Sequence, residues 1–400
     1  MSQTRRKSKP KSTLKYTAQL PAQKLANFKN TYKYGFSVVV TLVLIFTAGA
    51  VFIKINHRAA TKDDYKPPVN ETRISTDDTL LKQYIEAYGA DEAIKFLKTL
   101  PVDCHQRVHK VGRFSYELFG NKAFTVLNSE CMSGYTHGVT EAFFHEHGTE
   151  NLNKNLELIC QGQQSGFYAH QCFHGVGHGL MAYNDYDLPV ALKSCDNLQG
   201  DASKESCYTG VFMENVVGAI AVDEAKISHN TNEFHSSSWL SNDPLFPCNA
   251  VEDQYKSACY IFQTSRMIKL PNFDFQAVAS TCTKAEASYQ SICFLSMGRD
   301  VSSGYGSSYA EIEAVCSNYT NNTNYQRNCI AGASQDKFWH ESQQDDALKM
   351  CKAMQQTSSK QTCYETISAR GSEIITSHDS SQAFCTKFEP EYAKLCVVKS

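Results

Sequence analysis

Hydrophobic residues after position 78 recur at helical spacing. The stretches LLKQYIEAY (80–88) and DEAIKFLKTL (91–100) place apolar side chains three and four positions apart, with Gly89 between them. This spacing gathers the apolar residues on one face of an α-helix. Strand-like alternation is scarce elsewhere in the chain, so the pattern predicts an all-α fold.

A different pattern occurs near the N-terminus, where residues 34–53 form an uncharged, mostly apolar run of twenty residues. A helix of about 20 residues spans the roughly 30 Å hydrocarbon core of a bilayer. Residues 1–33 carry nine Lys or Arg and no acidic residue, which favours a cytoplasmic tail and an extracytoplasmic C-terminal part. A cleaved signal is the alternative, but its apolar core is shorter, about 7–15 residues. We therefore expect a single-pass membrane anchor at 34–53.

The cysteines predict the organisation of the part beyond the anchor. All sixteen lie after residue 100, and an even number on the extracytoplasmic side indicates disulfides. Seven pairs are separated by 11–13 positions: Cys160/Cys172, Cys195/Cys207, Cys248/Cys259, Cys282/Cys293, Cys316/Cys329, Cys351/Cys363 and Cys385/Cys396. Cys104 and Cys131 form an earlier, wider pair. In each unit we expect one helix to end near the first cysteine and another to begin near the second.

Most of these pairs follow one another at intervals of 34–35 residues. A fixed period of this size indicates an α-solenoid of helical hairpins. The period resembles that of tetratricopeptide and related repeats, but their W-x2-L-G-x2-Y pattern is absent, so the resemblance concerns architecture alone. Small residues recur three positions after the second cysteine, as at Gly175, Gly210 and Gly332, where they would let neighbouring helices approach closely.

These patterns divide the chain into six parts. They are a basic tail (1–33), the anchor (34–53), a polar flexible linker (54–78), histidine-rich hairpins (79–215), an inserted loop (216–247) and a helical-repeat scaffold (248–400). One interval between first cysteines is 53 residues instead of about 34, which predicts the inserted loop. The loop is either a lid over a site or a simple surface insertion.

Charge narrows the choice of partners. The formal net charge is −2, which argues against a nucleic-acid-binding protein. The expected partners are the membrane, through the N-terminal helix, and a protein on the exposed surface of the repeats.

Histidines suggest the chemistry. Three segments carry histidine or glutamate four residues apart, which places them on one helical face. These segments contain His105 and His109; then His137, Glu141 and His145; then His170, His174 and His178. Imidazole and carboxylate groups projecting from facing helices form metal sites in helical proteins.

The repeat gives a second reason to expect a local function. Six residues after the second cysteine of a unit lie His137, His178 and Met213, and Glu214 follows Met213. Later units have Ser265, Arg299, Gln335 and Ala369 at this position. The scaffold therefore does not require histidine there. The candidate metal ligands are His105, His109, His137, Glu141, His145, His174, His178 and Glu214, and His170 ranks below His174 and His178.

The expected cofactor is a transition metal ion, either zinc, iron or copper. The first hypothesis is a membrane-anchored extracytoplasmic metalloenzyme, hydrolytic or oxidative, in which Glu141 or Glu214 is a ligand or a general base. The alternative is a non-catalytic interaction scaffold with a structural or sensory histidine cluster. A third hypothesis is metal capture or delivery to another membrane protein. Without metal, the motif is either a buried histidine hydrogen-bond network or a set of surface or pH-responsive histidines.

Overall fold

The structure is a computed structural model, and it describes residues 72–398 apart from 101–103, 127, 129, 150–151, 153–159, 161–165, 229–236 and 376. The chain forms two compact units, residues 1–66 and 67–400. All described residues belong to the second unit. Within them no helix is both long and apolar enough to cross a membrane. The predicted anchor at 34–53 lies outside the described residues.

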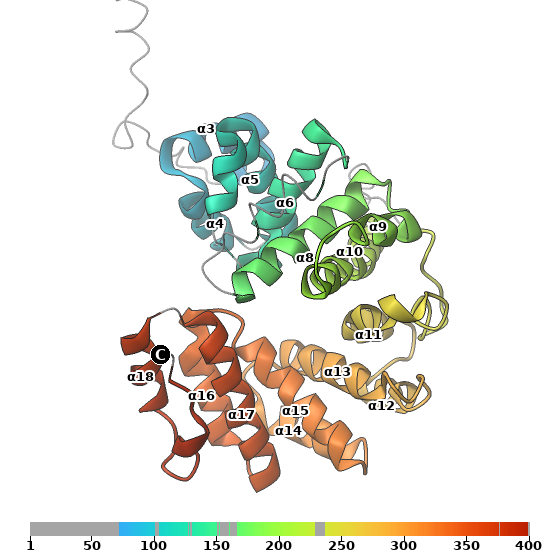
Figure 1. The fold of residues 1–400 in the computed structure, drawn as a ribbon, viewed down its shortest axis with the longest axis vertical. Coiled ribbons are helices and arrows are strands. Elements are labelled where there is room, and N and C mark those ends of the chain that lie inside the picture. Colours follow the sequence, from blue (N-terminus) through green and yellow to red (C-terminus); the bar gives the residue numbers. More distant parts are fainter. Residues whose placement is uncertain are drawn as a thin grey trace, which may run out of the picture. The chain divides into compact units, whose positions relative to one another are not determined.

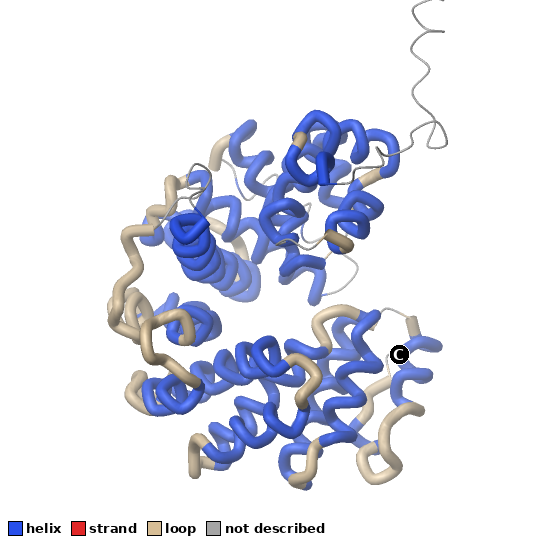
Figure 2. Tube along the Cα trace, turned by 180° about the vertical axis from the view of Figure 1, so that it is seen from behind, coloured by secondary structure: helices blue, strands red, loops and turns tan. Residues whose placement is uncertain are grey.

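The described part of the chain is helical and contains no β-strand (Figure 2), which confirms the all-α prediction. The first helices are α2 (Thr72–Thr76), α3 (Asp78–Tyr88), α4 (Ala90–Lys98), α5 (Cys104–Phe119), η1 (Gly120–Thr125), α6 (Glu130–His147), α8 (Gly166–Tyr183), α9 (Leu188–Cys195) and α10 (Asp201–Ser228). The later helices are α11 (Asp253–Met267), α12 (Phe275–Cys282), α13 (Gln290–Tyr305), α14 (Tyr309–Asn318), α15 (Thr323–Lys337), η2 (Glu341–Gln343), α16 (Gln344–Ala353), α17 (Thr357–Ile374), α18 (His378–Cys385) and η3 (Ala393–Leu395).

The longer helices form one continuous stack. Each helix packs on the next in the order α5, α6, α8, α10, α11, α13, α15 and α17 (Figure 1). The shorter helices α9, α14 and α16 each pack against two neighbouring long helices, while α12 packs on α13. This arrangement is the repeated hairpin organisation that the cysteine period predicts.

Each unit contains one disulfide, and most of the described cysteines lie in helices. All eight predicted pairs are present, including the wider pair Cys104–Cys131, so the pairing inferred from spacing is confirmed. Cys195, for example, ends α9 and is bonded to Cys207 in α10. Closing a loop of this size restricts the unfolded chain and stabilises the fold by about 3 kcal/mol in the chain-entropy account.

Glycines set the distance between certain long helices. A methyl group on Gly177 would lie 2.0 Å from the Cys207 carbonyl oxygen, and one on Gly210 would lie 1.9 Å from the His174 carbonyl oxygen. The backbones of α8 and α10 are therefore in direct contact. A methyl group on Gly332 in α15 would lie 1.9 Å from a backbone oxygen of α13. The predicted role of small residues is thus confirmed at Gly210 and Gly332.

Two boundaries differ from the sequence-based expectation. Residues 216–228, expected to begin an inserted loop, instead continue α10. Residues 72–76, expected to belong to a flexible linker, form α2, and the Asp77 carboxylate then accepts hydrogen bonds from the first amides of α3. Residues 72–76 are mostly polar, so hydrophobic spacing gives little signal there. Residues 216–222 (VVGAIAV) are mostly apolar, and the loop was expected from the long cysteine interval alone.

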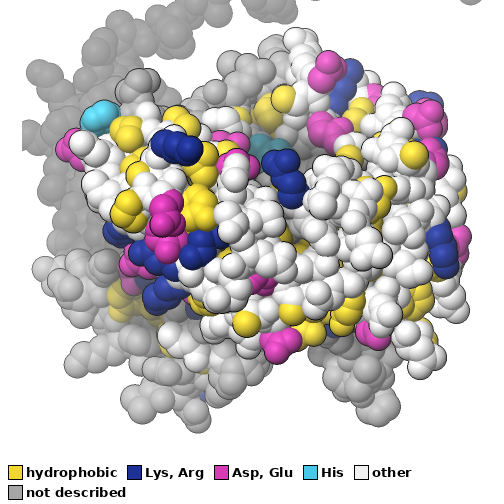
Figure 3. All heavy atoms as spheres, turned by 90° about the horizontal axis from the view of Figure 1, so that it is seen from below, with side chains coloured by type: hydrophobic (Ala, Val, Ile, Leu, Met, Phe, Trp, Pro, Cys, Tyr) yellow, Lys and Arg dark blue, Asp and Glu magenta, His cyan; other side chains and the backbone are white. Residues whose placement is uncertain are grey.

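The space-filling view shows how charge is distributed over one face of the molecule. Basic and acidic side chains lie interspersed with apolar ones on this face (Figure 3). Several charges of opposite sign are paired across helices, such as Lys387 with Asp345 at 2.9 Å.

Candidate metal centre

Three histidines come together where α6 and α8 pack. His137 of α6 and His174 and His178 of α8 have exposed fractions of 1%, 6% and 2%. One ring nitrogen from each lies within 4.8 Å of the others. A buried group of this size could hold a metal ion. Among the predicted ligands, these three are the ones that the structure groups in this way.

Glu214 of α10 fixes the orientation of His178. Its Oε2 lies 2.6 Å from His178 Nδ1, and the Tyr186 hydroxyl donates to its Oε1 at 3.3 Å. A carboxylate accepts, so Nδ1 of His178 is protonated, and in the neutral ring Nε2 carries the lone pair. A histidine that donates one ring N–H to a carboxylate while its other nitrogen faces a ligand position is the usual arrangement at metal sites.

Thr209 of α10 fixes His174 in the same tautomer. The Thr209 hydroxyl donates its single hydrogen to the Ser206 carbonyl oxygen at 2.6 Å. It therefore accepts from His174 Nδ1, which lies 2.8 Å away. The lone pair of His174 is then on Nε2.

The two lone pairs face one another. His174 Nε2 lies 3.1 Å from His178 Nε2 and 3.3 Å from the Met213 sulfur. Burial lowers the pKa of His174 well below its ordinary value, and the nearby His178, His170 and Arg299 lower it further. The ring is therefore neutral at pH 7, as a metal ligand must be.

His137 continues into a second chain of polar contacts. Its Nδ1 lies 3.2 Å from His109 Nε2, and His109 Nδ1 lies 3.8 Å from Glu141. Arg113 donates to both oxygens of Glu141, at 3.0 and 3.1 Å. Burial alone would raise the pKa of Glu141, but His109 and Arg113 outweigh it and lower that pKa. Glu141 is therefore an ionised carboxylate held by its neighbours.

The other predicted ligands lie in different surroundings. His145 is exposed and does not join the group. The side chain of His105 lies outside the described residues. His170, ranked lower from the sequence, lies 2.7 Å from the Ser206 hydroxyl, and burial lowers its pKa to about 4.

Sequence reasoning missed three residues of this centre as functional groups. Thr209 and Tyr186 orient His174 and Glu214, and Met213 contacts His174 directly. Met213 could have been predicted from the sequence, because it occupies the repeat position of His137 and His178. No sequence pattern pointed to Tyr186. It lies in the turn after α8, where Asp185 and Tyr186 have left-handed φ angles of 52° and 61°.

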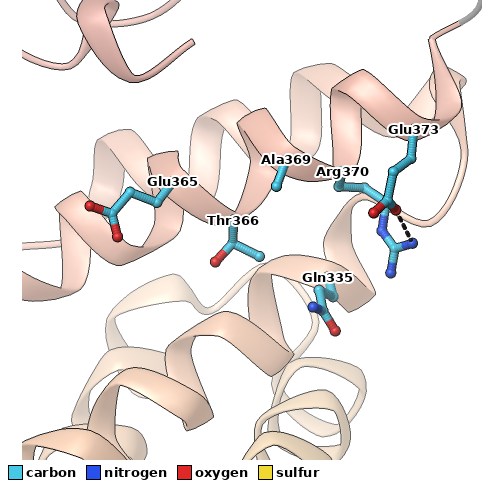
Figure 4. A pocket seen from close by; sticks show the side chains of 6 residues that line it. All are labelled: Gln335, Glu365, Thr366, Ala369, Arg370 and Glu373. Atoms are coloured by element: carbon cyan, nitrogen blue, oxygen red, sulfur yellow. Dashed lines mark hydrogen bonds and ion pairs between the residues drawn. The ribbon is translucent and has the colours of Figure 1, made fainter. Parts of the chain in front are cut away.

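A polar pocket lies farther along the stack, between α15 and α17. It has a volume of about 350 Å³ and is lined by Gln335, Glu365, Thr366, Ala369, Arg370 and Glu373 (Figure 4). Arg370 pairs with Glu373 at 3.0 Å. Gln335 and Ala369 occupy the repeat position that carries His137 and His178 in the earlier units.

In comparisons with known proteins, no family model, no curated protein and no solved structure matches this chain.

Proposed function

We propose that this chain is a metal-binding helical-repeat protein whose ion lies between α6, α8 and α10. One observation carries the proposal: the Nε2 atoms of His174 and His178, both assigned as unprotonated, lie 3.1 Å apart. Two lone pairs at this distance repel each other unless a proton or a metal ion lies between them, and a metal ion would use both nitrogens as ligands. Two ligands about 2.0 Å from one ion are roughly 3.3 Å apart at tetrahedral angles, which is close to this separation.

The surroundings support retention of a metal. Glu214 and Thr209 hold the two rings in the ligand tautomer, and such partners typically improve metal affinity about 10- to 100-fold. The same contacts give less support to catalysis by Glu141 or Glu214. A general base needs a carboxylate directed at substrate or water, whereas Glu141 is bound by Arg113 and Glu214 by His178.

We further propose that the metal-binding domain lies outside the cytoplasm, anchored by residues 34–53. The eight disulfides support an oxidising compartment. The anchor itself is supported by the length of its apolar run and by the basic tail before it.

Elemental analysis of the purified full-length chain tests the metal proposal. After reconstitution with zinc, iron or copper and removal of loose ions, we expect about one ion per chain. The double variant His174→Ala/His178→Ala should retain less than a tenth of it, while Gln335→Ala, at the equivalent repeat position in α15, should retain all of it.

Circular dichroism on each variant shows whether the fold is kept. No stoichiometric metal in the wild-type protein under any of these conditions would refute the proposal. It would leave a buried hydrogen-bond network within a non-catalytic scaffold.

A further inference from the structure

Met213 occupies the place in its unit that His137 and His178 occupy in theirs. It projects from α10 beside α8, and its sulfur lies 3.3 Å from His174 Nε2. That nitrogen carries a lone pair, because Nδ1 of the same ring donates to Thr209. A thioether sulfur offers only lone pairs and no strong donor. The contact therefore brings a third electron-pair donor to the point where the two histidines already meet.

The ring of His137, by contrast, is stacked on that of His178. The two centroids are 3.4 Å apart and the planes are inclined by 13°. The lone pair of an imidazole lies in its ring plane, and a bound ion sits about 2.0 Å from the nitrogen in that plane. An ion in the plane of His178 would therefore lie well outside the nearly parallel plane of His137, away from the direction of its lone pair.

His174 has the orientation that His137 lacks. Its ring is inclined by 63° to that of His178, with the centroids 4.8 Å apart. The two planes therefore cross, and an ion on their line of intersection can lie in both. The geometry selects His174 and His178 as the nitrogen ligands, with Met213 beside them and His137 as a packing partner.

This set of donors has a definite chemical character. Two neutral imidazoles and one thioether bring no negative charge to the ion, because the Glu214 carboxylate is bound to the far nitrogen of His178. Soft thioether ligands select copper(I), whereas zinc and iron(II) are better served by thiolate, imidazole and carboxylate. A neutral, buried and partly soft site fits a monovalent ion better than a divalent one.

We propose that the centre binds copper(I) through His174, His178 and Met213. This inference rests on the proposed metal-binding function and specifies its ion and third ligand. The ring of His137 packs against that of His178 and supplies no ligand atom.

The test is a titration of the detergent-purified full-length chain with copper(I) and, separately, zinc(II). Copper(I) is held with ascorbate under nitrogen, which leaves the disulfides intact, and bicinchoninate is the competing chelator. The wild-type protein should bind one copper(I) at least about 100-fold more tightly than zinc(II). X-ray absorption should show one sulfur about 2.3 Å from the copper.

Two variants separate the possible third ligands. Met213→Leu keeps the volume of the side chain and should weaken copper(I) binding about tenfold or more, remove the sulfur signal and leave zinc(II) binding within about threefold. His137→Phe keeps a stacked ring and should leave copper(I) affinity within about threefold. If His137→Phe is poorly folded, Met213→His supplies the comparison, because it should remove the sulfur signal and raise zinc(II) affinity.

The outcomes for the two proposals are distinguishable. Loss of copper in His137→Phe with unchanged binding in Met213→Leu would overturn the inference and favour a three-histidine site. A wild-type preference for zinc(II), or Met213→His with unchanged selectivity, would also overturn it, while the proposed metal-binding function would stand. Absence of any bound metal would refute both.

Discussion

The early and late halves of the helical stack share one scaffold but differ in what they place on it. In α6, α8 and α10 the position six residues after the second cysteine carries His137, His178 and Met213. In α13, α15 and α17 it carries Arg299, Gln335 and Ala369. Disulfides and glycine contacts recur in both halves. The difference shows that stability comes from the repeated framework, and that side chains at one repeat position are free to carry a local function.

The late half uses its position for other polar contacts. Arg299 donates to the Ile261 carbonyl oxygen at 2.9 Å and lies 4.6 Å from the Phe262 ring centre. The Phe262 ring in turn lies 6.0 Å from that of His174. Phe262 therefore lies between the two halves, close to His174 of the early half and to Arg299 of the late half.

The largest expected effect comes from the glycines that both halves share. Gly210→Ala and Gly332→Ala each place a methyl group 1.9 Å from a backbone oxygen of the neighbouring helix. Overpacking against rigid backbone costs about 3 kcal/mol, so urea denaturation should show a similar loss in both. Only Gly210→Ala moves the backbone of His174, so metal titration of the folded fraction should weaken in that variant alone. Equal weakening in Gly332→Ala would contradict the separation of the two halves.

The disulfides provide the next comparison. Replacing both cysteines of Cys195–Cys207 or of Cys282–Cys293 by serine should lower the free energy of unfolding by about 3 kcal/mol in each case. Cys207 anchors the start of α10, which carries Thr209, Met213 and Glu214. Metal affinity should therefore fall only in the first variant. The proposal of a locally built site fails here if removal of Cys282–Cys293 has the same effect on metal binding.

Buried carboxylates differ in purpose between the halves. Glu214 orients His178, whereas Glu313 accepts the amides of Gln355 and Gln356 at 2.7 and 2.9 Å, at the start of α17. Glu214→Gln should weaken metal binding about 10- to 100-fold. Glu313→Gln should cost about 1–3 kcal/mol of stability and leave metal binding unchanged. Calorimetry and metal titration of both variants check this, and an exchange of the two phenotypes would refute the assignment.

The smallest effect is expected from two threonines, the half-buried Thr209 and the buried Thr264. Thr209→Val removes the acceptor of His174 Nδ1, and we expect a loss of about 1 kcal/mol in stability together with weaker metal binding. Thr264→Val removes contacts of 2.5 Å to Ser296 and Asp300 in the late half. It should destabilise the fold without affecting the metal. Metal binding by Thr209→Val at wild-type strength would mean that Thr209 does not set the tautomer of His174.

Much of the fold was predictable because its signals are local or periodic. Helical spacing of apolar residues indicated the helices. The regular cysteine gaps correctly gave seven disulfide pairs, and the two remaining cysteines form the eighth. Helix ends were less predictable, as residues 216–228 show. There, continuation of α10 replaces the loop suggested by the excess length of one interval.

The site was predicted only in part, because residues spaced at multiples of four rotate gradually away from one face of a helix. At 3.6 residues per turn, a residue eight positions along a helix is rotated by about 80° and displaced by about 12 Å. His145 is therefore exposed, although it follows His137 at the expected spacing. His174 and His178 are one step apart and remain together.

The sequence by itself determined the helical class, the disulfide pairing and the enrichment of histidine in the early units. Each of these depends on residues near in the chain or on a fixed period. Tertiary structure decided which side chains meet. The glycine contacts bring α8 against α10, so that Thr209, Met213 and Glu214 reach the two histidines of α8. Whether these side chains meet depends on how closely α8 and α10 pack. Spacing along the chain does not encode that distance.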